Sequence, residues 1–293
     1  MQAIVGGSSM ILSPDFFILL SAPGFLGPDG KSHSFDNKAN GYGRGEGVAS
    51  VILKPLDAAL RDGDPIRAII RGTATNHDGK TPGISLPSQM AQEELIRSAY
   101  QNTGLSMAQT GYFEAHRTGT QAGDPLETSA IGNTIGVGGA ALEPLLIGSI
   151  KSNIGHLEGA SGLAGIIKAI LILEKGVIPA NAGFESPNPK LRLLEQGVNS
   201  FGFGGANAHV ILDDAYPYLQ DRNQAEDVAS DTSTKSNEES LPDVVATPRS
   251  DSMSTSDWQP ISSDTSMVFV LSSHHEGGCA SISQSLQQYI DEK

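Results

Sequence analysis

The segment from Gly148 to His156 constrains the fold of this chain more than any other part of the sequence. An apolar run, Leu145 to Ile147, precedes it, and a stretch of small and apolar residues, Gly159 to Glu174, follows it. This order predicts a buried strand, a polar loop and a helix, and in open α/β folds functional sites gather where such strands end. Lys151 and His156 would then lie side by side at the edge of the sheet. The same spacing also fits a solvated lysine and an ordinary polar histidine, so it marks a candidate site only.

A second segment repeats the order of strand, polar loop and helix. Tyr112 to Ala115 is predicted to form a strand, and His116 follows it directly. Asp124 and Glu127 have the spacing of a capping box, and Pro125 suits the first turn of a helix, where no amide donor is needed. We therefore expect a helix to begin here, which fixes where the His116 loop can lie.

A glycine-rich turn, Phe201 to Ala208, forms the third segment, and Val198 to Leu212 is predicted to form a hairpin around it. Together with the segments around His116 and Lys151, it resembles the second half of a β-ketoacyl synthase, the condensing domain of polyketide and fatty-acid synthases. The similarity is closest to the highly reducing type I polyketide synthases of fungi. It covers residues 2–213 almost continuously.

The resemblance implies an α/β architecture, the thiolase-like condensing-enzyme fold with its αβαβα layers. We expect this fold to be incomplete in its N-terminal half. Residues 1–55 would be the remnant of that half, and residues 56–213 would be the C-terminal half. Residues 214–265 are rich in Ser, Asp, Thr and Glu and poor in large apolar side chains, which predicts a disordered acidic linker. Residues 266–293 would begin the linker that leads to an acyltransferase domain in the family.

The chemistry implied by the resemblance is a decarboxylative Claisen condensation. A cysteine holds the acyl chain as a thioester, while two histidines and a lysine assist loss of carbon dioxide from a malonyl thioester, whose carbanion attacks the acyl group. Neutral imidazoles suit this role because they can donate to a developing enolate oxygen. The family's catalytic positions correspond to His116, Lys151 and His156. The turn that lines the acyl pocket corresponds to Phe201, Phe203 and Gly204, although core packing would explain the two phenylalanines equally well.

The resemblance also implies partners. The family's substrates are acyl and malonyl thioesters carried on the phosphopantetheine of an acyl carrier protein, and its members form condensing-enzyme dimers. We expect no cofactor and no metal in the chain itself. The formal net charge of -14 and the pI of about 4.8 argue against binding to nucleic acid or to an anionic membrane surface.

The first 23 residues are apolar but lack the basic start of a signal peptide, and Pro14 and Asp15 interrupt them. We interpret them as a buried strand, Ala3 to Gly7, and a short core helix, and not as a secretion signal or a membrane span. The sequence contains one cysteine, Cys279, which excludes an internal disulfide and is compatible with a cytoplasmic location.

The family's nucleophilic cysteine is expected upstream of the first strand, and this sequence begins after that position. Cys279 is a poor substitute, because no residue near it in the sequence would stabilise a thiolate. Arg117 stands where the family has glycine, directly after His116, and we expect its charge to disfavour the protonated histidine. The segment between Lys190 and Val198 is also shorter than in the family.

Three interpretations follow. The chain could be a catalytic component that works with a second chain supplying the cysteine, a non-catalytic remnant or partner of a condensing enzyme, or a fragment of a full-length active synthase whose start is mis-assigned. Condensation by this chain alone is not expected, because the covalent step needs the cysteine. Some decarboxylation could survive at the histidines. The strands Ala3 to Gly7 and Val48 to Lys54 would lack partners and expose apolar edges, so we also expect poor solubility.

Apolar patterns and chain breakers predict the remaining elements. A helix should run from a cap at Ser88 to Asn102, with Gly104 beyond its end and Met90 on its buried stripe. The glycine string Gly41 to Gly47 precedes a strand and lacks a following Lys-Ser/Thr pair, so we interpret it as tight turns near the site and not as a phosphate loop. The further strands are Val48 to Lys54, Ile66 to Thr75 and Met267 to Ser272.

Overall fold

The computed structural model describes residues 2–83, 86–120, 123–136, 145–189, 191, 205–219 and 266–272. Five strands form an antiparallel sheet in the order β1-β2-β7-β3-β6, and two short strands form a parallel pair, β4-β5. The strands are β1 (Ala3–Ser9), β2 (Gly47–Pro55), β3 (Ala68–His77), β4 (Tyr112–Glu114), β5 (Leu146–Gly148), β6 (Ala206–Asp213) and β7 (Ser266–Ser272). The helices are α1 (Asp15–Ser21), α2 (Leu56–Asp62), α3 (Gln89–Thr103), α4 (Gly123–Ile131), α5 (Lys151–Ile154) and α6 (Ser161–Lys175). The predicted α/β class is therefore confirmed.

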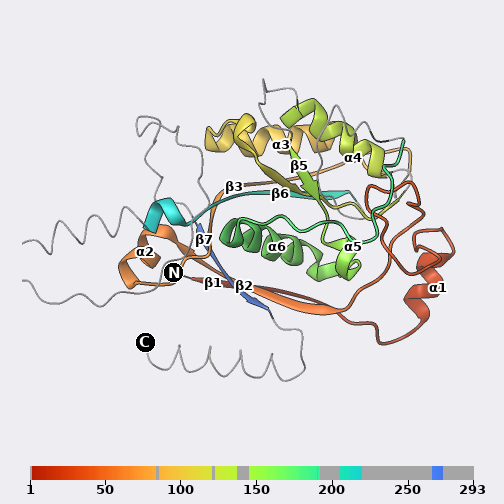
Figure 1. Cartoon of the computed structure of the whole chain (residues 1–293), viewed down its shortest axis with the longest axis horizontal. Helices are drawn as coiled ribbons and strands as arrows, with labels where there is room; N and C mark the ends of the chain where they lie inside the picture. Colours follow the sequence, from red (N-terminus) through yellow and green to blue (C-terminus); the bar gives the residue numbers. More distant parts are fainter. Residues whose placement is uncertain are drawn as a thin grey trace, which may run out of the picture.

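Helix α6 lies at the centre of the molecule, between the pair β1–β2 and the pair β3–β6, while α3 and α4 lie beyond β3–β6 (Figure 1). The apolar side chains between α6 and the five-stranded sheet include Ala49 and Val51 of β2, Ala68 of β3, and Leu163 and Ile170 of α6. Helix α6 packs against several strands of this one sheet, and its apolar side chains supply that contact.

The ends of the longer helices follow the predicted signals. The Ser88 hydroxyl accepts a hydrogen bond from the amide of Ala91 at 3.3 Å, and α3 ends before Gly104, whose φ is 66°. Gly176, with a φ of 61°, ends α6 in the same way. The prediction that Met90 lies on the buried stripe is wrong, because its side chain is exposed at the first turn.

The N-terminal segment forms the predicted strand and helix, but the prediction that they are buried is wrong. Strand β1 pairs with β2 on one side, and Ile4 and Val5 of β1 are exposed. Helix α1 has no buried residue, so Ile18 and Leu19 face outward. In the described part of the chain, these apolar residues therefore lie on the surface and not in the core.

The predicted hairpin is only partly placed. Strand β6 forms and pairs with β3 in antiparallel orientation. Residues 192–204, which include the first part of the predicted hairpin, lie outside the described part of the chain. The ordered core continues beyond residue 213, where the linker was predicted to begin, because Ala215 and Tyr218 are buried against Leu56 and Ile69.

The predicted strand near residue 267 also forms. It is β7, which pairs with both β2 and β3 and so connects the two halves of the sheet. Among the helices of the described residues, none has the length and apolarity that crossing a lipid bilayer requires.

Candidate functional site

The parallel pair β4–β5 brings two of the predicted loops to one edge. Glu114, the last residue of β4, aligns with Gly148, the last residue of β5, and the next amide, that of Ala115, donates to the Gly148 carbonyl at 2.7 Å. His116 comes directly after β4, and Lys151 begins α5 shortly after β5. Because parallel strands end at the same edge, the two side chains approach each other there.

The two predicted histidines are in contact. The rings of His116 and His156 lie edge to face, with centroids 5.4 Å apart and an interplanar angle of 84°. Lys151 is buried, with 4% of its surface exposed, and its charge acts on both rings. The ring of Tyr42 lies against His156 at 5.0 Å. The structure thus brings the three predicted catalytic residues together.

The glycine string holds the loop that carries His156. The His156 amide donates to the Gly43 carbonyl at 2.8 Å, and the Gly45 amide donates to the His156 carbonyl at 2.9 Å. A Cβ atom at Gly43 would collide with the Gly30 carbonyl oxygen. Gly155, just before the histidine, has a φ of 75°, which favours glycine. The glycine string therefore serves close packing beside the site, as expected.

One hydrogen bond fixes the tautomer of His156. The amide of Glu158 donates to Nδ1 of His156 at 2.9 Å, and the Ser161 hydroxyl lies 3.3 Å from the same nitrogen. A ring nitrogen that accepts an N–H bond carries no proton. The neutral ring therefore carries its proton on Nε2, which makes Nε2–H its hydrogen-bond donor.

The electrostatics keep both histidines neutral. Burial, followed by the charge of Lys151, lowers the pKa of His116 well below its usual value and that of His156 to about 3. Burial also lowers the pKa of Lys151 to about 8, although the nearby carboxylates of Glu114 and Glu127 favour its charged form. At pH 7 the site therefore holds two neutral imidazoles and a mostly protonated lysine.

Glu114 and Lys168 belong to the site, and the sequence analysis did not identify them. Lys168 of α6 is buried and lies 2.9 Å from Oε2 of Glu114, which also accepts a hydrogen bond from the Tyr112 hydroxyl at 2.6 Å. Oε1 of Glu114 accepts from the Ile150 amide at 2.6 Å, one residue before Lys151. A charged lysine within the apolar α6 segment was the available signal, because buried charges need a partner.

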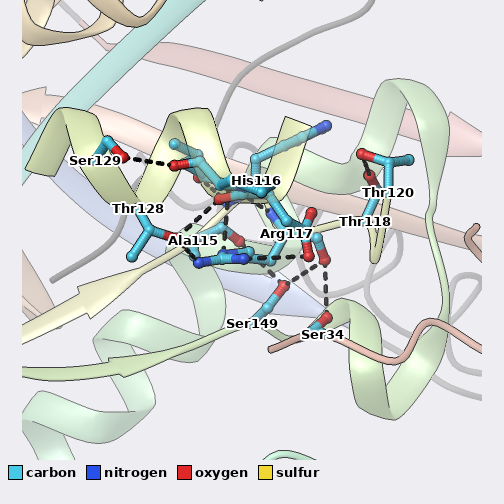
Figure 2. A network of polar contacts seen from close by, with 12 residues as sticks. Ser34, Ala115, His116, Arg117, Thr118, Thr120, Thr128, Ser129 and Ser149 are labelled. Carbon is cyan, nitrogen blue, oxygen red and sulfur yellow. Dashed lines mark hydrogen bonds and ion pairs between the residues drawn. The ribbon is translucent and has the colours of Figure 1, made fainter. Parts of the chain in front are cut away.

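Arg117 behaves differently from the expectation. Its side chain is fully buried and reaches Asp124, Glu127 and Thr128 of α4, and Figure 2 shows its contact with Thr128. The neighbouring charge that lowers the pKa of His116 is that of Lys151, so the expected direct effect of Arg117 on the ring is not observed.

The prediction that Asp124 and Glu127 form a capping box is also wrong. Helix α4 already begins at Gly123, so Asp124 and Glu127 lie within it. Oε1 of Glu127 accepts a hydrogen bond from the His116 amide at 3.0 Å, and Oε2 accepts one from the Arg117 amide at 3.2 Å. The two acids therefore hold the histidine loop and do not cap the helix.

Some predicted site residues cannot be placed. Phe201, Phe203 and Gly204, expected to line an acyl pocket, lie outside the described residues, and so does Cys279. Their predicted roles stay predictions.

Two family models match most of the described chain. The model for the β-ketoacyl synthase N-terminal domain matches residues 1–59, and the model for the β-ketoacyl synthase C-terminal domain matches residues 67–185. The glycine string lies in the first region, and the histidines and Lys151 lie in the second.

Fungal polyketide synthases are similar to this chain. The highly reducing polyketide synthase alnA of Emericella nidulans is 55% identical over 238 residues, which cover 75% of this chain and 10% of the relative. The reducing polyketide synthase FUB1 of Gibberella moniliformis is 45% identical over 307 residues, which cover 99% of this chain and 12% of the relative. The chain thus spans about a tenth of the length of these relatives.

Solved ketosynthase structures are similar as well. The ketosynthase from module 6 of the bacillaene synthase of Bacillus subtilis 168 aligns with a TM-score of 0.69 at 34% identity, covering 73% of this chain and 42% of that chain. The oxazolomycin ketosynthase domain OzmH KS7 of Streptomyces albus JA3453 aligns with the same TM-score at 35% identity and the same coverage. These similarities confirm the thiolase-like fold. The chain belongs to the β-ketoacyl synthase family and represents part of the ketosynthase domain of a polyketide synthase.

Proposed function

We propose that His116, Lys151 and His156 form the part of a ketosynthase site that decarboxylates malonyl thioesters and stabilises the resulting enolate. The observation that carries this proposal is the contact between two neutral imidazoles beside a buried lysine. The substrate would be a malonyl group on the phosphopantetheine of an acyl carrier protein. The chain would contribute no cofactor of its own, and it would act in the cytoplasm within a condensing-enzyme dimer.

The proposed reaction breaks one carbon–carbon bond. Carbon dioxide leaves the malonyl group, and the electron pair of the broken bond forms a thioester enolate. Its oxygen accepts hydrogen bonds from neutral imidazole N–H groups, one of them Nε2–H of His156. Lys151 adds a positive charge to the site, which favours the negative charge that develops on the enolate.

Condensation needs one further group. The enolate carbon attacks an acyl thioester, a new carbon–carbon bond forms, and a cysteine thiolate leaves the tetrahedral intermediate. The resemblance places the family's nucleophile upstream of β1, and Cys279, the one cysteine of this sequence, lies outside the described residues. We therefore propose that this chain supports decarboxylation and that condensation requires a cysteine from another polypeptide segment.

The test is to incubate the whole chain with malonyl-loaded acyl carrier protein and to follow acetyl-loaded carrier by mass spectrometry. We expect acetyl carrier to accumulate above the uncatalysed rate, with no β-ketoacyl product. His116→Ala and His156→Ala should each remove most of this rate, while His77→Ala, at the exposed end of β3, should keep it. Equal rates for the wild-type chain and both site variants would overturn the proposal.

A second candidate function is a non-catalytic partner of a condensing enzyme. The exposed apolar side chains of β1 and α1 favour it, because surfaces of this kind mark association sites. Absence of decarboxylation together with stable association with a complete ketosynthase would support this second function.

A further inference from the structure

Arg117 has no direct route to a substrate. None of its surface is exposed, and its guanidinium carbon lies 4.5 Å from the centre of the Phe35 ring. Nη1 lies 3.2 Å from Oδ2 of Asp124, and Nη2 donates to the Thr128 hydroxyl. The side chain therefore acts only on the protein around it.

The backbone at Arg117 is tied to three parts of the molecule. Its amide donates to Glu127, together with the amide of His116. Its carbonyl accepts from the hydroxyls of Ser34 and Ser149, at 2.8 and 3.4 Å (Figure 2). These contacts join the histidine loop to α4, to the loop before the glycine string, and to the residue that follows β5.

The conformation of Arg117 requires this support. Its φ is 23°, on the side of the backbone map that favours glycine, and such residues persist only where their surroundings determine the backbone. Glycine would adopt this angle more easily but would leave Asp124 and Glu127 buried without a cation. The guanidinium lies near both carboxylates and so allows them to remain beneath the loop.

We propose that Arg117 is the positioning residue of this site: from beneath the loop, its buried guanidinium holds α4 against the backbone of His116 and so sets the contact between His116 and His156. This inference rests on the proposed function only for the role of His116. The geometric part stands on the contacts of Arg117 alone.

The test uses the whole chain and nuclear magnetic resonance of labelled histidines. Arg117→Met keeps an unbranched side chain of similar length but removes the charge and the donors. We expect loss of the nuclear Overhauser contact between the His116 and His156 rings. Arg117→Lys keeps the charge but lacks the planar set of donors, so it should restore the ring contact only in part.

The matched control is Lys54→Met. Lys54 is also a buried cation that pairs with two carboxylates, Asp62 and Asp64, but it lies at the far end of β2 from the site. The Lys54→Met variant should melt at a lower temperature and keep the contact between the His116 and His156 rings. If Arg117→Met fails to fold, Arg117→Met combined with Asp124→Asn removes one charge of each sign and is read in the same way.

The positioning role is overturned if Arg117→Met, or the double variant, melts at a lower temperature but keeps the ring contact of the wild-type chain, as Lys54→Met should. The readouts require no catalysis. A chain that loses the ring contact but never decarboxylates malonyl carrier would therefore support this inference and reject the proposed function.

Discussion

Glu114 and Lys168 form a buried ion pair beside the segment that carries Lys151. The Lys168 ammonium lies 2.9 Å from one Glu114 oxygen, and the other oxygen accepts the Ile150 amide just before Lys151. Glu114 thus acts on two lysines: it is in contact with Lys168, and its charge favours the protonated form of Lys151. The pair explains why the charge of Lys151 is only partly compensated.

The first prediction concerns Lys168→Met. The repulsion from Lys168 disappears and Glu114 becomes free to interact with Lys151, so the pKa of Lys151 should rise from about 8 by roughly 1 unit. The measurement is a titration of lysines labelled with ¹³C at Cε. Lys175→Met, at the exposed last residue of α6, is the control and should leave Lys151 unchanged. An unaltered Lys151 titration in Lys168→Met would show that the ion pair does not influence the site.

The second prediction concerns acid stability and His209. This histidine is buried beside the rings of Tyr100 and Phe113, and among the described residues its Nε2 has no hydrogen-bond partner. Burial lowers its pKa from 6.5 to about 4. Below pH 6.5 the unfolded chain binds a proton that the folded chain does not, so stability is lost as the pH falls from 6.5 towards 4. The loss at pH 5 should be about 2 kcal/mol from this group.

His209→Phe should remove this contribution, because phenylalanine fits an aromatic site and does not titrate. Urea unfolding at pH 7 and pH 5 measures the difference, and the pH dependence should be smaller in the variant than in the wild-type chain. His77→Gln, at an exposed position, should retain the full dependence. Equal slopes for His209→Phe and the wild-type chain would contradict the assignment.

The third prediction compares two glycines. Gly43→Ala places a methyl group against the Gly30 carbonyl and should destabilise the chain by more than about 1 kcal/mol, because backbone atoms must move. Gly162→Ala adds a methyl group in α6 where no atom lies within 4 Å, and it should be neutral or stabilise by up to about 1 kcal/mol. Thermal melts of both variants provide the measurement. A stable Gly43→Ala variant would mean that the glycine string does not pack as closely as described.

The fourth prediction concerns association. Val5 on β1 and Ile18 on α1 are exposed apolar residues, and β1 pairs on one side only within the described residues. We expect the chain to self-associate, and Val5→Lys combined with Ile18→Lys should shift it towards monomer because charges on an edge strand block pairing. Analytical ultracentrifugation measures the distribution. Met90→Lys, an equally exposed position on α3, should have little effect. A monodisperse wild-type monomer would contradict this prediction.

The sequence predicted where helices and strands begin and end near the site more accurately than it predicted which of them are buried. The caps of α3, the stop of α6 and the strand before His116 follow from local rules that depend on a few neighbouring residues. The exposure of β1 and α1 could not be predicted in this way, because an apolar run does not show whether another layer covers it.

The role of Arg117 shows the same limit. Its position after His116 suggested an effect on the ring, but the direction of a long side chain depends on distant partners such as Asp124 and Phe35. Glu114 and Lys168 are separated by more than fifty residues, and no spacing rule links them. Local sequence patterns therefore predict which residues gather at the candidate site, and tertiary contacts decide what surrounds them.

The hydrogen bonds between Gly43 and His156 have a consequence for domain engineering. They join the region matched by the N-terminal family model to the region matched by the C-terminal model. A chimera spliced between residues 59 and 67 would leave each region intact, yet the His156 loop and the glycine string that holds it would come from different parents. Exchange of either region between synthases should therefore succeed only when the parents agree at the glycine string and at the loop it holds.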